Sequence, residues 1–358
     1  MRFGLIEINN FRGIKQARLD NLADINIFIG KNSTGKSAIL EAIYLVSSNF
    51  TYDWVFYPAF VRIIEKRGWT LERFEDICEE LKFKYERSPI IKVDKRAFRI
   101  EVLEDTHSDW FENISRTKPS FVKRKKCVTF DTFENTTNEW YCSQVVWVAE
   151  NKLDAYVLHG KEFKDEFEKE VFRKTILVDE SFLRDLKQTA KIFEKLVDIR
   201  GYKIKSDLLR GLRRKYPQIM DLDVKQNVLR LIFEDFSITL PSVADGIKSC
   251  LVASMVTCIL DNGVLCFEEP ENHLHPSLQK LYASYIVSSA KNLKNQIFIS
   301  THSLEFLNYL LKEAQRKNVT LHVYHFLDLK DGKLIYSLYK RDDALRAVEE
   351  IGIDVRGR

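Results

Sequence analysis

The sequence lacks most of the features that mark secreted, membrane-bound or zinc-binding proteins. Its six cysteines include no CxxC pair, so neither a disulfide framework nor a zinc knuckle is expected. The most apolar run, residues 249–260, is far below the ~20 residues that a membrane span needs. The N-terminus carries Glu7 within its first apolar stretch and has no signal-peptide core. We therefore expect a cytoplasmic protein that does not enter a membrane.

A large excess of charge is also absent. Lys and Arg number 56, and Asp and Glu number 52, which gives a formal net charge of +4. This balance argues against a surface coated by nucleic acid but allows a local basic patch. Hydrophobic residues make up 45% of the 358 residues, enough for a sizeable core. A chain of this length forms one large domain or about two to three lobes.

Two separate parts of the sequence alternate strands with helices. Residues 25–29 predict a buried apolar strand, and the apolar spacing of residues 38–46 predicts a helix after it. From about residue 225 onward, strands and helices alternate again, which predicts a parallel sheet with helices on its faces. We therefore assign residues 1–50 and 225–358 to one core.

The residues between these two parts have a different character. Residues 51–89 predict mainly helix and residues 90–149 predict strands, so we expect 51–150 to be a mixed part of the first lobe. Apolar side chains at helical spacing over 161–198 predict a helical arm, which we assign to 151–224. Residues 115–126 carry six basic side chains and no acid.

Residues 30–37 match the phosphate-binding pattern G-x-x-x-x-G-K-[ST] without a gap. The two glycines let the backbone curl so that its N–H groups point at phosphate oxygens, and the following helix directs its positive dipole end at the same anion. Lys36 is suited to the β- and γ-phosphates, and the Ser37 hydroxyl is suited to Mg²⁺. The candidate nucleotide-binding residues in this loop are Gly30, Lys31, Asn32, Ser33, Thr34, Gly35, Lys36, Ser37 and Ala38.

Two predicted strands end in side chains that are suited to ATP hydrolysis. The apolar segment 264–267 leads into Glu268 and Glu269. Because neighbours on a strand point to opposite sides, one carboxylate can hold Mg²⁺ while the other orients and deprotonates a water molecule. His302 follows the apolar segment 296–300. At the carboxyl edge of a parallel sheet, where ligands bind, a neutral imidazole can hydrogen-bond a γ-phosphate or the attacking water.

In this order, the segments resemble the ABC-type ATPase heads of the SMC-like and OLD-like group, often called AAA family ATPases in prokaryotes. The resemblance covers residues 1–50 and about 225–358. It rests on INNFRGI at 8–14, the Walker A loop at 30–37, LPSVADGIK at 240–248 in place of the signature motif, EEPENHLHP at 268–276 with its ENxLHP pattern, and His302 in place of the switch histidine.

The resemblance implies an α/β fold, a P-loop NTPase of the ABC-ATPase-head type. Its mixed sheet would carry helices on both faces, with an N-terminal antiparallel β lobe and a largely helical insertion. The resemblance further implies that Glu269 and His302 are catalytic, that Glu268 is the acid on the magnesium side, and that Arg12 contacts the nucleotide. In such heads the signature motif caps the γ-phosphate held by a second copy. The matching signature residues are Ser242, Ala244, Asp245, Gly246 and Lys248, and the D-loop residues are Glu271, Asn272 and His273.

The sequence departs from the family pattern at several points. Glu268 stands where Walker B usually has Asp, and its extra methylene changes the reach to Mg²⁺. Ala244 and Asp245 replace the usual Ser and second Gly of the signature. A Q-loop glutamine is not evident, with Gln144 as a weak candidate. A zinc-hook CxxC and a long coiled coil are absent, and the short stretch after His302 argues against a TOPRIM nuclease domain.

We therefore expect a slow Mg²⁺-dependent ATPase that dimerises head to tail around ATP. The resulting switch would act on DNA or on a partner protein through residues 51–224, as in repair or defence ATPases. Two alternatives stay open. The first is a regulatory scaffold that binds nucleotide with little or no hydrolysis, and the second is a nucleic-acid-binding protein that uses the basic segment 115–126.

Overall fold

The computed structural model describes residues 2–48, 59–68, 79–84, 87–104, 126–134, 140–149, 152–159 and 174–349. Thirteen strands of this part of the chain form one mixed sheet in the order β8-β7-β6-β5-β4-β1-β2-β16-β15-β3-β14-β13-β9. Their bounds are β1 (Ile6–Phe11), β2 (Ile14–Leu19), β3 (Ile25–Gly30), β4 (Ile90–Val93), β5 (Arg96–Glu104), β6 (Lys126–Glu134), β7 (Trp140–Ala149), β8 (Lys152–His159), β9 (Thr175–Val178), β13 (Val264–Glu268), β14 (Gln296–Ser300), β15 (Leu321–Lys330) and β16 (Lys333–Lys340).

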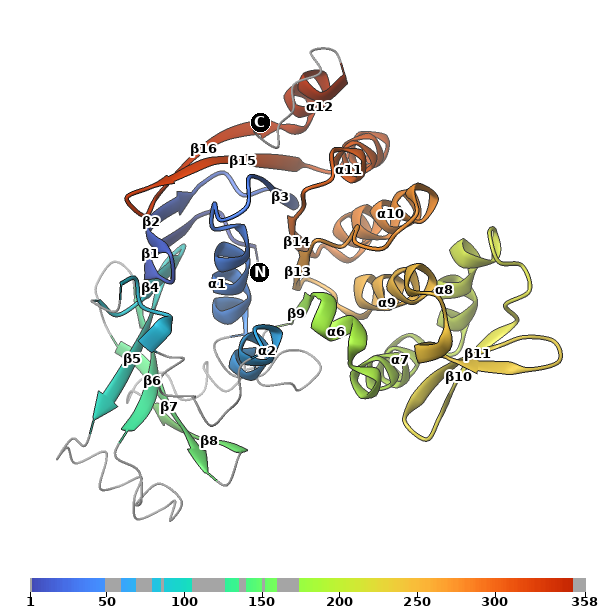
Figure 1. The fold of residues 1–358 in the computed structure, drawn as a ribbon, viewed down its shortest axis with the longest axis horizontal. Coiled ribbons are helices and arrows are strands. Elements are labelled where there is room, and N and C mark those ends of the chain that lie inside the picture. The colour runs from blue at the N-terminus through green and yellow to red at the C-terminus, as the bar shows by residue number, and fades with distance from the viewer. Residues whose placement is uncertain are drawn as a thin grey trace.

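The sheet has a parallel half and an antiparallel half. Strands β9, β13, β14, β3 and β15 run parallel to one another. Strand β16 pairs antiparallel with β15 and joins β2, after which β1 and β4 to β8 continue as antiparallel neighbours (Figure 1). The predicted mixed sheet with an N-terminal antiparallel lobe is therefore confirmed.

Helices cover both faces of the parallel half, as predicted. Helices α1 (Lys36–Ser47) and α2 (Ala59–Lys66) lie on one face, and α9 (Asp245–Ile259), α10 (Pro276–Leu293) and α11 (Leu304–Lys317) lie on the other (Figure 1). Strand β3 is apolar on both faces, because successive side chains of a strand point to opposite faces of the sheet. Ile25, Ile27 and Ile29 pack into the core formed with α9 to α11, whereas Phe28 packs against α1. In the described part of the chain, no helix has both the length and the apolar character needed to cross a bilayer.

The expected helical arm at 151–224 is wrong in two places. Residues 152–159 form strand β8 of the antiparallel lobe, and Thr175–Val178 forms β9, the fully buried edge strand of the parallel half. Four consecutive apolar or β-branched residues favour a buried strand, a signal that the charged residues on either side obscured. Residues 160–173 lie outside the described part. The division of the chain into lobes at 50, 150 and 225 stays a prediction.

The remaining elements pack beside the core helices. Helices α7 and α8 contact α9, and their apolar side chains share its core. A separate three-stranded sheet follows them, and a short 3₁₀ helix leads into α9. The bounds are α6 (Glu180–Arg184), α7 (Leu186–Arg200), α8 (Lys203–Arg213), β10 (Asp221–Lys225), β11 (Val228–Ile232), β12 (Ser237–Thr239), the 3₁₀ helix (Leu240–Ser242) and the last described helix, α12 (Arg341–Glu349).

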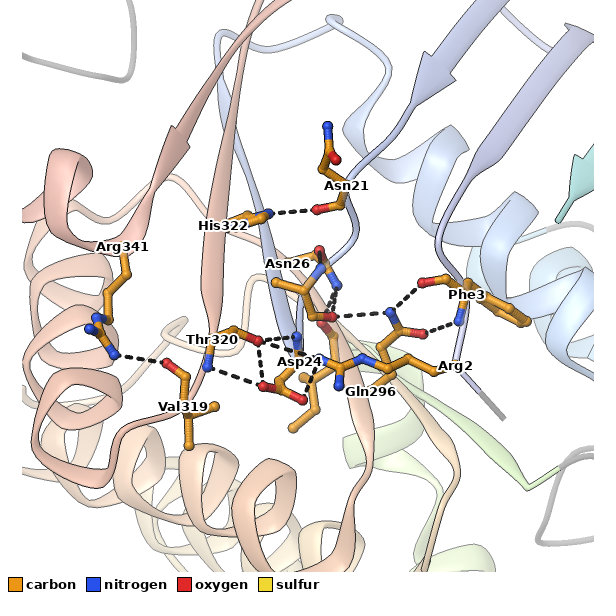
Figure 2. Close-up of polar contacts among 12 residues, drawn as sticks. Arg2, Phe3, Asn21, Asp24, Asn26, Gln296, Val319, Thr320, His322 and Arg341 are labelled. Atoms are coloured by element: carbon orange, nitrogen blue, oxygen red, sulfur yellow. Dashed lines mark hydrogen bonds and ion pairs between the residues drawn. The ribbon is translucent and has the colours of Figure 1, made fainter.

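A polar network joins the first residues of the chain to the amino ends of the parallel strands (Figure 2). The Gln296 side chain, 2% exposed, accepts the N–H of Phe3 at 2.8 Å and donates to the carbonyls of Phe3 at 2.9 Å and Ala23 at 3.0 Å. Beside it, the amide of Thr320 donates to the Asp24 carboxylate at 3.1 Å. Because the backbone groups of Phe3 and Ala23 are buried, the Gln296 side chain supplies the partners that a ladder would otherwise provide.

Replacing Gln296 should therefore destabilise the protein. We expect Gln296→Ala to lower the free energy of unfolding by about 2–4 kcal/mol, since it leaves the buried N–H and carbonyl groups of Phe3 without partners. The exposed Gln315→Ala on α11 is the control, and its effect should stay within about 0.5 kcal/mol. Urea unfolding followed by circular dichroism measures both, and equal stabilities would contradict this role of Gln296.

Candidate nucleotide-binding site

A pocket of about 360 Å³ opens at the carboxyl ends of the parallel strands. The loop between β3 and α1 meets the residues that follow β13 and β14 there. The lining residues are Arg12, Gly13, Ile14, Asn32, Ser33, Gly35, Lys36, Ser37, Ala38, Arg67, Glu269, Ser300, His302 and Leu329. The structure thus gathers the phosphate loop, Glu269 and His302, which lie far apart in the sequence, at one edge of the sheet.

The phosphate loop depends on its two glycines. Gly30 has a φ of +150°, and a Cβ there would lie 2.3 Å from the carbonyl oxygen of Phe326 on the neighbouring strand β15. Gly35 has a φ of +89° and stands at the N-cap of α1. Because glycine has no capping side chain, the first N–H groups of α1 stay available to an anion. The loop is therefore shaped for a phosphate group.

Lys36 lies at the centre of this loop. Its Nζ donates to the carbonyl oxygens of Gly30 at 3.0 Å and Lys31 at 2.6 Å. Burial lowers its pKa to about 8, against the opposing influence of Glu269. The ammonium group is thus only partly compensated, and a phosphate oxygen would supply the negative charge that two carbonyl oxygens lack.

The other loop residues divide into two groups. Asn32, Ser33, Ser37 and Ala38 line the pocket with Gly35 and Lys36. Gly30, Lys31 and Thr34 are absent from its wall. They shape the loop instead, since the Thr34 hydroxyl donates to the Lys31 carbonyl at 2.8 Å.

Glu269 is held at the rim of the pocket by three contacts. Its backbone N–H donates to the carbonyl of Ser300 at 2.9 Å, which ties the end of β13 to the end of β14. The side-chain amide of Asn272 donates to one carboxylate oxygen at 2.9 Å, and His302 Nε2 lies 3.4 Å from the other. The carboxylate, 40% exposed, therefore faces a site that water can reach.

His302 is neutral at pH 7 in this environment. Burial, together with the charge of Lys36, lowers its pKa, and Glu269 only partly opposes this shift. The contact with Glu269 is thus a long hydrogen-bond-type contact from a neutral imidazole rather than an ion pair. A neutral ring keeps one nitrogen as a donor and the other as an acceptor.

Glu271 supports His302 from within the protein. It is 8% exposed, and one of its oxygens accepts from the Thr301 hydroxyl at 2.6 Å and from the backbone N–H of His302 at 3.0 Å. Burial raises its pKa. Among the three predicted D-loop residues, Glu271 thus hydrogen-bonds Thr301 and His302 of its own chain, and Asn272 hydrogen-bonds Glu269. His273 is exposed.

Glu268 is absent from the wall of the pocket. One of its carboxylate oxygens forms an ion pair with the ammonium group of Lys66 on α2, and its side chain is 14% exposed. The structure therefore points Glu268 toward α2 and Glu269 toward the pocket, as the alternation of side chains along a strand requires.

The same Lys66 belongs to a buried ionic network around Glu41 of α1. The Glu41 carboxylate is 0% exposed and accepts from Lys66 and Arg67, each at 2.8 Å, and from Arg12. Burial pushes the pKa of Glu41 upward, but Lys66, Arg12 and Arg67 outweigh burial and hold it at about 2. Because Arg12 and Arg67 also line the pocket, the network sets its positive wall.

The signature candidates lie outside the pocket of their own chain. None of Ser242, Ala244, Asp245, Gly246 and Lys248 appears among the described residues that line it. Asp245 begins α9 with its side chain 69% exposed, and the ammonium group of Lys248 contacts it at 2.8 Å. This pair turns the carboxylate toward its own helix and partly offsets the negative charge in the signature segment.

Other residues of the sequence analysis are placed as follows. Gln144 lies within β7 of the antiparallel lobe. Residues 115–126, apart from Lys126 at the start of β6, lie outside the described part of the chain. His275 is the N-cap of α10 and accepts from the N–H of Ser277 at 3.3 Å. Among the described residues, no cluster of three or more His, Cys, Asp or Glu side chains could hold a metal ion.

Sequence analysis missed Arg67, Lys66 and Glu41. A signal existed for Glu41, which stands between Leu40 and Ala42 on an otherwise apolar helix, because a carboxylate in such a place requires a partner. Arg67 and Lys66 gave no comparable signal. They occur in a segment rich in charged residues, and only the packing of α2 against α1 brings them to the site.

Removing the Glu41 charge should destabilise the protein in a pH-dependent way. Since the pKa of Glu41 is lowered from 4.5 to about 2, its stabilisation is present above pH 4.5 and is lost as the pH falls toward about 2. We expect Glu41→Gln to lower the free energy of unfolding by about 3 kcal/mol at pH 7, and by about 1 kcal/mol less at pH 3.5. Urea unfolding at both pH values, with the exposed Glu194→Gln as control, measures this. A loss that does not change with pH would contradict it.

Comparison with known proteins places this geometry in context. Residues 1–195 and 159–307 match the AAA ATPase domain family. The uncharacterized protein MJECL11 of Methanocaldococcus jannaschii is 33% identical over 116 residues, which is 32% of this chain and 100% of MJECL11. The DNA replication and repair protein RecF of Lactococcus lactis is 43% identical over 47 residues, 13% of each chain. This chain therefore spans only a small part of RecF.

A solved structure shows the same fold. The crystal structure of an SMC head bound to the C-winged helix domain of ScpA aligns over 96% of this chain and 100% of its own, with a TM-score of 0.55 and 12% sequence identity. At this identity the likeness concerns the fold alone, which is that of an SMC-like ABC ATPase head. Because the matched segments together span residues 1–307, well over half of the sequence, the chain belongs to the AAA ATPase domain family.

Proposed function

We propose that this protein binds ATP together with Mg²⁺ in the pocket at the carboxyl edge of the sheet and hydrolyses it slowly. The observation that supports the proposal is the convergence of the phosphate loop, Glu269 and His302 on one pocket. Each supplies a different requirement of phosphoryl transfer, namely a phosphate cradle, an acceptor for the proton of water, and a polar group at the γ-phosphate.

The phosphates are held by backbone amides and three cations. The N–H groups of the loop and of the first turn of α1 cradle the β- and γ-phosphates, and Lys36 exchanges its carbonyl partners for a phosphate oxygen. Arg12 and Arg67 also line this pocket. Because Glu41 also binds both guanidinium groups, they are held in place before the nucleotide arrives, which reduces the entropy lost on binding.

The residues present fit a magnesium ion. Mg²⁺ takes oxygen ligands and usually keeps several waters, with one or two protein groups and substrate phosphates completing its shell. Here the Ser37 hydroxyl lines the pocket and would be a ligand of the ion. Glu268 is paired with Lys66 outside the pocket wall, so it would have to turn away from Lys66 to hold the ion or its waters. When bound, the ion neutralises phosphate charge.

Glu269 is the proposed general base. Asn272 and His302 hold its carboxylate at the pocket rim, where it accepts a proton from the attacking water. His302 stays neutral and therefore donates one hydrogen bond without adding a charge beside Lys36. Glu271 fixes the backbone of His302 and acts as a positioning residue.

The signature segment is proposed to act on a second copy of this chain. Ser242, Ala244 and Asp245 are exposed and do not line the pocket of their own chain, so two chains in head-to-tail contact can cap each other's γ-phosphate. A triphosphate is strongly charged, and donors from two chains neutralise it better than donors from one. ATP would thus hold the dimer together, and hydrolysis would release it.

We propose that this conformational switch acts on DNA or on a partner protein through residues 51–224. Two comparisons support this direction. RecF is named for DNA replication and repair, and the aligned SMC head is bound to the C-winged helix domain of ScpA. In both cases the support comes by analogy, because the RecF match is short and the SMC match shows fold alone.

A regulatory scaffold with little hydrolysis is the second candidate. The ion pair between Lys66 and Glu268 favours it, since an engaged carboxylate is a weaker partner for the Mg²⁺ shell. The signature lacks its usual Ser, so one donor to the γ-phosphate is missing. Steady-state turnover distinguishes the two candidates.

Glu269→Gln should abolish most of the hydrolysis. General-base catalysis contributes about 10²–10⁴-fold, so we expect kcat to fall at least about 100-fold with little change in the Kd for ATP. Phosphate release in the presence and absence of Mg²⁺ measures turnover, and the exposed Glu234→Gln is the control. Negligible turnover in the wild type would favour the scaffold, and full activity in Glu269→Gln would exclude Glu269 as the base.

The Glu269→Gln protein should also accumulate as a dimer. This variant should bind Mg·ATP without hydrolysing it, so the ATP-bound dimer should persist. Gel filtration with light scattering should then show twice the monomer mass. ADP, or the Lys36→Met variant with ATP, should leave the monomer. A monomer under all three conditions would contradict ATP-dependent dimerisation while leaving the hydrolysis result unaffected.

A further inference from the structure

A second and larger cavity, about 730 Å³, lies outside the nucleotide pocket. It is a groove along the first half of α10, lined also by residues of α11 and by the end of α8 with the two residues that follow it. Ser277, Leu281 and Ser284, on one face of α10, form its floor. We call it the α8–α10–α11 groove. It shares no lining residue with the nucleotide pocket.

Close helix packing forms one side of this groove. A Cβ at Gly211 of α8 would lie 2.2 Å from the hydroxyl of Tyr285 and 2.8 Å from Leu281 Cδ1, both on α10. A side chain at this position would force the ends of Tyr285 and Leu281 to move, so the glycine favours this close approach of α8 to α10. The backbone that follows Gly211 is thereby fixed along the groove and carries Arg214 and Lys215 to its wall.

The groove is strongly basic. Five cations come from three helical segments, and the one lining carboxylate is Glu313. Arg316 binds Glu313 at 2.6 Å and Lys317 lies 2.7 Å away, and these contacts hold its pKa at about 2 although burial opposes them. The carboxylate is thus already neutralised. The five lining cations are Arg214, Lys215, Lys280, Lys312 and Arg316.

Three of these cations are not compensated by acids in the described part of the chain. Arg214, Lys215 and Lys280 form no ion pair with any described residue. This contrasts with other cations of the same region, since Arg210 pairs with Asp207 and Arg200 pairs with Asp261. In a chain whose net charge is only +4, such a concentration attracts an anion with several charges.

The dimensions fit a chain of phosphates. Ser277 and Ser284 are seven residues apart on α10, which corresponds to about 10 Å along the helix. One nucleic-acid strand carries a phosphate every ~3.4 Å along the duplex axis, so about three phosphates fit along the floor. A single phosphate ion would occupy only part of this length.

The lining chemistry favours a phosphate backbone over an acidic peptide. The guanidinium and ammonium groups of the groove are the usual donors to phosphate and sugar oxygens. The hydroxyls of Ser284 and Tyr309 already donate to Glu313 and Glu305, so the cations carry the proposed contact. A bound peptide instead gains most of its affinity from large apolar anchors in deep pockets. Leu281 and Tyr309 are the only sizeable apolar or aromatic side chains among the described lining residues.

We propose that the α8–α10–α11 groove binds the sugar-phosphate backbone of a nucleic acid without reading its sequence. This proposal names nucleic acid as the partner of the switch and in that respect rests on the proposed function. Binding in the groove itself needs no nucleotide. The groove is also separate from the basic segment 115–126.

The position of the groove suits a partner that must sense the nucleotide. Helix α10 begins directly after the loop that contains Glu269, Glu271 and Asn272, and α11 begins directly after His302. Tyr309, in the groove, is six residues beyond the N-cap Ser303, about 9 Å along α11. A nucleic-acid strand in the groove would therefore contact α10 and α11, the two helices that follow the proposed catalytic side chains.

Fluorescence anisotropy with the full chain tests the proposal. The probes are a labelled 20-nucleotide oligo-dT strand and a labelled 20-base-pair duplex, at 50, 100 and 200 mM NaCl without nucleotide. We expect salt-dependent binding of at least one probe. Lys215→Gln with Lys280→Gln should raise its Kd at least about 10-fold and should flatten the slope of log Kd against log salt by about 1.

A matched pair of charge removals controls for net charge. Lys225→Gln with Lys333→Gln removes two exposed lysines outside the groove, and we expect less than about a 2-fold change in Kd. Lys36→Met should bind the probe like the wild type, so failure of ATP binding and failure of the groove can be told apart. Circular dichroism melting shows whether the groove variant is folded, and Arg214→Gln is the milder second variant.

Several results would overturn the proposal. They are the absence of binding at 50 mM NaCl, equal losses in the groove and control pairs, or a loss produced only by neutralising Lys123 to Lys126. A poly-glutamate chain that displaces the probe at lower charge concentration than unlabelled oligo-dT would assign the groove to an acidic protein segment instead.

Discussion

The buried carboxylate of Glu41 is the interaction on which the site depends. It brings together Arg12 from the turn between β1 and β2, Lys66 from the end of α2, and Arg67 just after it. A carboxylate with no exposed surface is strongly unfavourable unless it is paired and hydrogen-bonded. The fold therefore retains three cations at this place, and two separate segments, the turn between β1 and β2 and the end of α2, are held against α1 as a consequence.

This network also explains the charge of the nucleotide pocket. Arg12, Lys66 and Arg67 carry three positive charges, and Glu41 and Glu268 carry two negative charges, so the network has a net charge of about +1. Arg12 and Arg67 face the pocket and Lys66 faces Glu268. The excess positive charge thus lies where a triphosphate would bind. The same contacts hold the Glu268 carboxylate, at the end of β13, against α2, a helix outside the segments that carry the sequence motifs.

The two cavities are connected by the helices on the far face of the sheet. Strands β13 and β14 end at the nucleotide pocket, and the helices that follow them form the floor and one wall of the basic groove. Close-packed helices move as units because their interiors leave no free volume. A change at Glu269 or His302 on nucleotide turnover would therefore shift the groove, which gives the proposed nucleic-acid site a physical route to the ATPase.

The sequence by itself determined the parallel core and the phosphate loop. Strand β3, the loop, α1, β13 and β14 carry local signals, because apolar runs, glycine pairs and terminal carboxylates reflect the preferences of neighbouring residues. Only the tertiary structure decided the partners of Glu41 and Glu268, the place of β9 in the sheet, and the basic groove. Each of these joins residues from segments far apart in the chain, and their meeting depends on how α2, α8 and β9 pack, which no local pattern encodes.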